Sequence, residues 1–144
     1  MKTDYEKFKE AIICFNQSLQ IDECQTVLYL LRGSAKNRIL NFKDALNDYK
    51  KYLELSKNDT DPVILIVLGT LELNLNHYHE AIKYYTEAIA INNNYSIAYL
   101  RRATAFQAIN QKMLSEFDIK EANEIILNKK DVRFTRADIT EEEL

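Results

Sequence analysis

Apolar residues recur at spacings of three and four along almost the whole chain, which is the pattern of amphipathic helices. We expect seven helices, at residues 4–22, 26–39, 42–56, 62–75, 78–91, 95–109 and 112–127. The chain has only two glycines and one proline, too few for the many turns of a β-sandwich or barrel. The pattern therefore predicts an all-α protein.

Polar residues at the expected helix ends support these limits. Thr3 and Glu6 form the capping-box pattern that begins a helix. Asp61 offers an N-cap acceptor before Pro62, which suits the first turn because no partner for its missing N–H is needed there. The asparagines at 92–94 predict a polar break in which asparagine adopts left-handed backbone geometry.

The chain also repeats itself. Segments that begin at Phe8, Phe42, Tyr78 and Lys112 align at offsets of 34, 36 and 34 residues. Each segment has a small residue followed four positions later by a larger one: Ala11 and Phe15, Ala45 and Tyr49, Ala81 and Tyr85, Ser115 and Ile119. A second apolar segment precedes each of the last three, so the repeated unit is a pair of helices.

These repeats resemble the tetratricopeptide repeat (TPR) family, in which helix pairs follow one another at this period. The best match combines Leu65, Leu68 and Gly69 on one helix with Ala81, Tyr85 and Ala88 on the next. The resemblance implies an α-solenoid, that is, a TPR-like right-handed superhelix of antiparallel helix pairs. The array would cover residues 1–129, with a half repeat at 3–25, repeats at 26–59, 62–95 and 96–129, and a tail at 130–144.

Some positions depart from the family pattern. Lys36 and Glu72 stand where the first helix of a repeat usually has an aromatic residue. Tyr52 replaces a small residue near the end of a second helix, and two extra residues follow in the segment SKNDTD. We therefore expect looser packing between the first and second full repeats.

The resemblance implies binding of a partner's peptide or helix in a concave groove lined by the first helices. The positions that resemble groove-facing ones are Val27, Leu30, Leu31, Ser34, Asn37, Val63, Ile66, Val67, Thr70, Leu73, Asn74, Ile97, Leu100, Arg101, Thr104 and Gln107. The middle first helix is apolar on all its faces, and such a helix is normally buried on every side.

Three arrangements could bury the middle helix. Its aliphatic residues could belong to the core between repeats. The tail could fold back and fill the groove with Val132, Phe134 and Ile139. A partner helix or a second copy of the chain could cover the groove, as large exposed apolar patches usually indicate. In the last case, aspartate at Ile66 and Leu73 is expected to abolish association.

Charge and composition exclude other classes of partner. Nineteen basic residues against 22 acidic ones give a net charge of −3, which disfavours nucleic acid and anionic membranes. The most apolar stretch, residues 62–75, is too short to span a bilayer. The charged N-terminus is no secretory signal, and Cys14 and Cys24 fit a buried thiol on a helix and a surface thiol in a turn. We expect a cytoplasmic protein.

Alternative functions find less support. A co-chaperone clamp for an acidic C-terminus needs basic and amide groups where this chain has Leu30, Ser34 and Val67, so that only Arg101 could serve. An RNA-binding helical repeat needs a basic groove. His77 and His79 fit solvated turn residues, and we expect no catalytic site, metal or cofactor. Thr140 and Glu143 form a second capping-box pattern, which predicts the start of a further helix.

Overall fold

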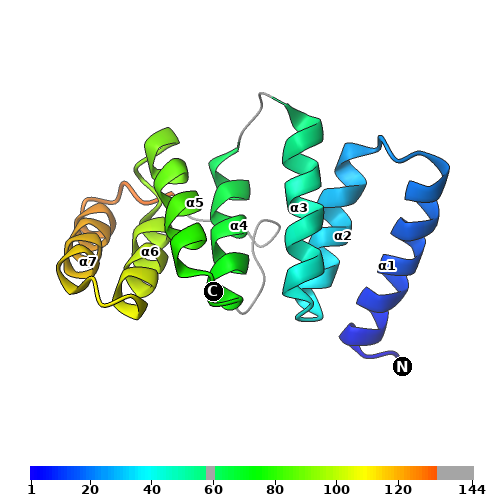
Figure 1. The fold of residues 1–144 in the computed structure, drawn as a ribbon, viewed down its shortest axis with the longest axis horizontal. Coiled ribbons are helices and arrows are strands. Elements are labelled where there is room, and N and C mark those ends of the chain that lie inside the picture. Colours follow the sequence, from blue (N-terminus) through cyan, green and yellow to red (C-terminus); the bar gives the residue numbers. More distant parts are fainter. Residues whose placement is uncertain (58–60, 133–144) are drawn as a thin grey trace. The chain divides into compact units, whose positions relative to one another are not determined.

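The computed structural model describes residues 1–57 and 61–132, which contain seven α-helices and no strand (Figure 1). The helices are α1 (Asp4–Ile21), α2 (Thr26–Arg38), α3 (Phe42–Ser56), α4 (Pro62–Asn74), α5 (Tyr78–Ile91), α6 (Ser96–Ala108) and α7 (Lys112–Leu127). The prediction from periodicity is confirmed to within one residue at every helix end.

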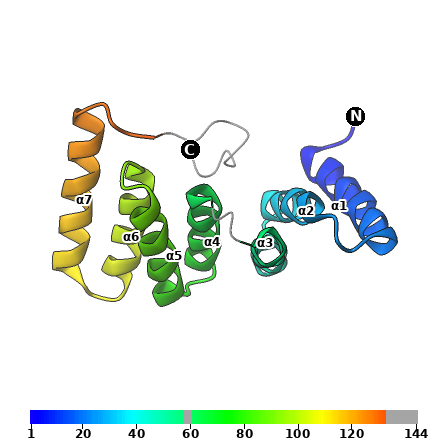
Figure 2. The same cartoon turned by 90° about the horizontal axis from the view of Figure 1, so that it is seen from above.

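The chain divides into two compact units, residues 1–60 and 61–144. In the first unit, α1 packs on α2 and α2 on α3. In the second, α4 packs on α5, α5 on α6 and α6 on α7, while the two first helices α4 and α6 also touch (Figure 2). The boundary between the units falls at the junction where Tyr52 and the SKNDTD segment predicted looser packing.

The predicted helix caps are found, but one turn differs. Thr3 and Glu6 form both bonds of a capping box, and Asp61 Oδ1 accepts from the backbone N–H of Val63 at 2.9 Å. No residue of the asparagine run 92–94 has a positive φ, so the prediction of left-handed geometry there was wrong. Asn92 is extended, and its Oδ1 accepts from the backbone N–H of Asn94, so the side chain closes the turn.

In the first two full repeats, the helix pair packs a tyrosine ring against a glycine. In the middle repeat the ring of Tyr85 lies directly over Gly69, where an added Cβ would meet ring atoms at 2.7–2.9 Å. In the first full repeat the glycine and the tyrosine ring are farther apart, because a Cβ on Gly33 would lie 3.1 Å from the ring of Tyr49. The absence of a side chain on Gly69 therefore allows α4 and α5 to come close.

We expect Gly69→Ala to lower the free energy of unfolding by roughly 1–2 kcal/mol, since overpacking outweighs the gain in helix propensity. Tyr85 cannot move aside, because its side chain is fully buried. Gly33→Ala is the matched comparison, and we expect a smaller loss or none from its wider contact. Urea unfolding followed by circular dichroism measures both; equal effects would contradict this account of the packing.

Helix α1 corresponds to the second helix of a repeat, but unlike α3, α5 and α7 it has no first helix before it in the described chain. The residues of α1 are therefore less buried than those at the same repeat positions of α3 and α5. Ala45 and Ala81 are fully buried, whereas the aligned Ala11 is half-buried. Cys14 is exposed, although the sequence suggested a buried thiol. The reason is that Cys14 aligns with Asp48, which is turned toward its own first helix, and α1 has no such neighbour within the described chain. Cys24 is exposed, as predicted.

Candidate functional site

The first helix of the first unit, α2, leaves aliphatic side chains open to solvent. Val27 is 60% exposed and Leu31 is 44% exposed, one turn apart on the same face. Leu30 and Ser34 beside them are half-buried. Asn37 is buried, so it does not contribute to this surface. Four of the five residues predicted on this helix therefore lie together at an accessible face.

Helix α4 is different, because all nine residues from Ile64 to Glu72 are buried. Among the predicted groove residues, Ile66 is only 1% exposed and Val67 is also buried. The Thr70 hydroxyl lies 3.0 Å from the Tyr85 hydroxyl on α5, so its side chain is engaged in the helix pair. Val63 and Leu73 are half-buried and Asn74 is exposed. The predicted groove residues of α4 that solvent can reach therefore lie only at the two ends of the helix.

The predicted groove residues of helix α6, which are Ile97, Leu100, Arg101, Thr104 and Gln107, form a row along the helix that we call the α6 stripe. Leu100 is 39% exposed, Thr104 and Gln107 are exposed, and Ile97 and Arg101 are half-buried. Their spacing of three and four places them on one face of the helix. The aliphatic residues Ile97 and Leu100 occupy the same repeat positions as Val27 and Leu30 on α2.

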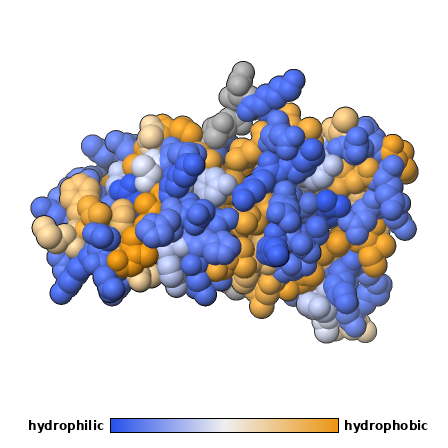
Figure 3. Space-filling model, in the orientation of Figure 1, coloured by the Kyte–Doolittle hydropathy of each residue, from blue (hydrophilic) through white to orange (hydrophobic). Residues whose placement is uncertain are grey.

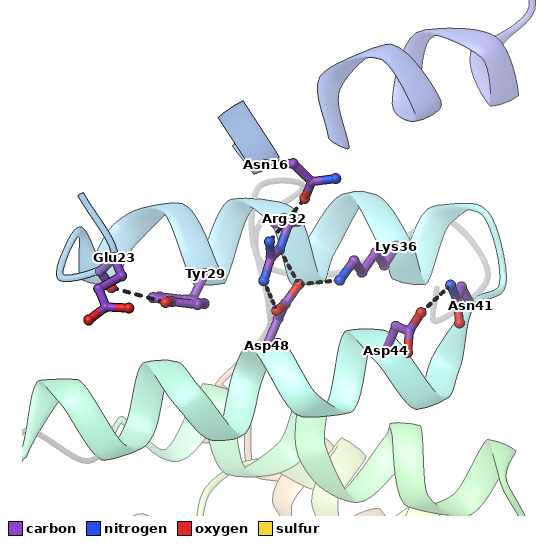
Figure 4. A network of polar contacts seen from close by, with 8 residues as sticks. All are labelled: Asn16, Glu23, Tyr29, Arg32, Lys36, Asn41, Asp44 and Asp48. Carbon is purple, nitrogen blue, oxygen red and sulfur yellow. Dashed lines mark hydrogen bonds and ion pairs between the residues drawn. The ribbon is translucent and has the colours of Figure 1, made fainter. Parts of the chain in front are cut away.

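A polar network inside the first unit was not predicted from the sequence (Figure 4). The Arg32 guanidinium on α2 donates from Nε and Nη2 to the two carboxylate oxygens of Asp48 on α3, at 2.9 and 2.7 Å. Its Nη1 donates to Asn16 on α1, and Lys36 forms a second ion pair with Asp48 at 3.0 Å. These hydrogen bonds with Asp48 raise the pKa of Arg32 above its ordinary value, so the guanidinium stays charged. The network joins all three helices of the unit.

The same arrangement recurs in the second unit. Arg102 on α6 donates to both carboxylate oxygens of Asp118 on α7, at 2.8 and 2.7 Å. Its Nη1 donates to Thr86 on α5, which aligns with Asn16. The guanidinium also lies 5.6 Å from the ring centres of Tyr99 and Phe106. The arginine thus connects the pair α2 and α3 with α1 in the first unit, and the pair α6 and α7 with α5 in the second.

The middle repeat replaces this ion pair with apolar packing. Leu68 stands at the position of the two arginines and Tyr84 at that of the two aspartates. Burial raises the pKa of Tyr84, and the negative charge of Glu72 raises it further. The repeat alignment contained the signal for the two ion pairs, because Arg and Asp recur together in the first and third repeats.

The histidines lie at the start of α5. His77 is the N-cap residue, and its Nδ1 lies 2.9 Å from Oε2 of the buried Glu72; His79 is exposed. Among the described residues, no three His, Cys, Asp or Glu side chains are grouped so that they could hold a metal ion. None of the described helices combines the length and the apolar character needed to cross a membrane.

Exposed apolar side chains also gather on the terminal helix of the second unit (Figure 3). Met113, Leu114 and Phe117 on α7 are exposed, although the aligned residues of α5 are His79, Glu80 and Lys83. This patch was also not predicted. Its residues belong to α7, whereas those of the stripe belong to α6.

Comparisons with known proteins agree with the repeat pattern. Residues 62–95 match the family model of the tetratricopeptide repeat. The fold is similar to that of MamA, with a TM-score of 0.75 and 22% identity over 87% of this chain and 75% of that chain. It is also similar to YrrB, a TPR protein with an unusual peptide-binding site, with a TM-score of 0.73 and 17% identity over 83% of this chain and 61% of that chain. A search of curated proteins found no match.

Proposed function

Since the chain is a tetratricopeptide repeat protein by its sequence at residues 62–95 and by its seven-helix fold, we propose that it binds a segment of a partner protein. Proteins of this family are generally interaction modules rather than enzymes. The proposed role is that of a cytoplasmic scaffold or adapter without cofactor, and the bound segment is a helix or extended peptide.

One observation carries this proposal. Two aligned positions hold aliphatic residues in all three first helices: Val27, Val63 and Ile97 at one, and Leu30, Ile66 and Leu100 at the other. In α2 and α6 these positions are at least partly accessible, although an isolated helix pair gains nothing from aliphatic residues facing water. A partner that covers them would gain about 25 cal/mol per Å² of apolar area, less the entropy of ordering.

The surface that we propose is smaller than the predicted groove. In the first unit it comprises Val27, Leu30, Leu31 and Ser34 on α2. The second unit has a surface of its own, made of Val63, Leu73 and Asn74 on α4 and Ile97, Leu100, Arg101, Thr104 and Gln107 on α6. Ile66, Val67 and Thr70 are left out because they are buried. Aspartate at Ile66 would test folding as much as binding, so the test belongs at exposed positions.

The test is selection from a peptide library on the full chain, followed by binding measurements on the selected peptides. We expect the selected peptides to have apolar residues at spacings of three and four. In the double variant Val27→Asp with Leu31→Asp, we expect the affinity for these peptides to fall at least about tenfold, or 1.4 kcal/mol. Ile13→Asp is the matched control, because Ile13 is an exposed aliphatic residue on α1.

Each other outcome has a defined meaning. Binding that depends on a free acidic C-terminus would favour the co-chaperone alternative over this surface. RNA retained in a filter-binding assay would favour the RNA-binding alternative. If the double variant stays folded and binds the selected peptides as tightly as the wild type, the proposed surface is wrong.

A further inference from the structure

The chain beyond α7 turns back onto the start of α6. Lys129 has a positive φ of 55°, and the N–H groups of Lys129 and Lys130 donate to the last carbonyls of α7, which ends the helix. The next two residues make long-range contacts. Asp131 Oδ1 accepts from the backbone N–H of Ser96 at 2.9 Å, and the N–H of Val132 donates to the carbonyl of Asn94 at 2.8 Å.

Asp131 acts as the missing cap of α6. The N-cap residue Tyr95 makes no side-chain capping bond, so the first N–H groups of α6 need an acceptor from elsewhere. The carboxylate of Asp131 provides it and also adds negative charge at the positive end of the helix dipole. Asp131 and Val132 are both half-buried, so the chain is held at this point by two backbone-directed bonds. Figure 2 shows this segment, in orange, running from the end of α7 toward α6.

These two bonds determine where the rest of the chain begins. The described chain ends with Asp131 and Val132 beside Asn94 and Ser96, within one to two turns of Ile97 and Leu100 on the α6 stripe. Residues 133–144 lie outside the described part, and twelve residues can reach roughly 40 Å when extended. The 13 residues of α6 are about 20 Å long, so the segment can follow the whole stripe.

The composition of this segment suits the surface. The sequence RFTRADITEEEL contains three large apolar residues, Phe134, Ile139 and Leu144. Ile97 and Leu100 are the aliphatic residues of the stripe. Asp138 and the glutamates at 141–143 outnumber Arg133 and Arg136, so the segment is negative on balance, whereas Arg101 contributes positive charge to the stripe. An opposite charge on each side favours association.

We propose that residues 133–144 bind to the α6 stripe of their own chain, with Phe134 and Ile139 against Ile97 and Leu100. Because Asp131 and Val132 anchor the segment next to the stripe, its effective concentration there is in the millimolar range. A partner that uses the same stripe must displace it, so the segment sets a threshold for binding. This competition rests on the proposed function, but the intramolecular contact does not.

The contact can be tested on the full chain without any partner. The protein contains no tryptophan, so Phe134→Trp introduces a single tryptophan fluorophore. We expect its emission to be blue-shifted and its quenching by acrylamide to be several-fold weaker than in the reference variant Ile21→Trp. Ile21 is 88% exposed at the end of α1 and reports a tryptophan in water.

The stripe is then changed in the Phe134→Trp background. Leu100→Asp should raise acrylamide quenching to the level of the reference, and Leu100→Ser should do so in part if the aspartate disturbs folding. Leu114→Asp on α7 is the matched control, because it changes a leucine of similar exposure away from the stripe. We expect it to leave quenching unchanged, with circular dichroism confirming that all variants are folded.

Three results would overturn the proposal. A tryptophan at 134 quenched as strongly as the reference would show that the segment does not bind. Protection that survives Leu100→Asp would place the segment elsewhere. Protection lost on dilution would show that a second copy is the binding partner. If the contact is found but Phe134→Ser with Ile139→Ser does not strengthen peptide binding, the competition fails while the contact stands.

Discussion

Replacing Asp118 by alanine is expected to lower the free energy of unfolding by about 3–5 kcal/mol, because it leaves a charged arginine without its partner inside the protein. The side chain of Asp118 is 1% exposed and that of Arg102 is 14% exposed. The guanidinium lies 5.6 Å from the centres of two aromatic rings and donates to the hydroxyl of Thr86, so it cannot turn into water without breaking these contacts. Urea unfolding of the variant beside the wild type measures the loss.

The controls separate burial of charge from changes elsewhere on α7. Glu116→Ala removes an exposed carboxylate from the same helix, and we expect a change within about 0.5 kcal/mol. The double variant Arg102→Leu with Asp118→Tyr copies the pair Leu68 and Tyr84 of the middle repeat. It should be more stable than Asp118→Ala, since apolar residues can replace a buried ion pair with little loss. A loss in Asp118→Ala no larger than in Glu116→Ala would contradict the structural role of the pair.

The helices could be predicted from the sequence because a helix end depends mostly on local residues. The apolar period, the capping box at Thr3 and the pair Asp61 and Pro62 are each readable within a few positions. The break at residues 92–94 was also found, but its backbone geometry was not. The side chain of Asn92 accepts the N–H of Asn94, and this bond closes the turn without a positive φ.

The candidate surface could be predicted only in part, for a different reason. Periodicity shows that a helix has an apolar face, but α4 is apolar on all faces, and so its pattern does not say which residues stay accessible. Burial of Ile66 and Val67, and the bond from Thr70 to Tyr85, follow from tertiary packing. Likewise, no local pattern indicates that Asp131 caps a helix 35 residues away.

Truncation of Tyr85 to alanine is expected to cost about 3–5 kcal/mol, as for other large buried aromatic residues. Its side chain is fully buried, its ring covers Gly69, and its hydroxyl lies 3.0 Å from that of Thr70. Tyr85→Phe should cost only about 1 kcal/mol, because the ring stays and Thr70 keeps its bond to the Ile66 carbonyl. Thermal or urea unfolding distinguishes the two variants.

The third repeat has a different pair of residues at the positions of Gly69 and Tyr85. There, Ala103 replaces the glycine, and the shorter Ile119, which is 42% exposed on the terminal helix α7, replaces the tyrosine. We therefore expect Gly69→Ala to be destabilising in the wild type but neutral or stabilising in a Tyr85→Ile background. The coupling energy in this double-mutant cycle should be at least about 1 kcal/mol, as is usual for residues in contact. Additive effects would mean that the ring does not set the distance between α4 and α5.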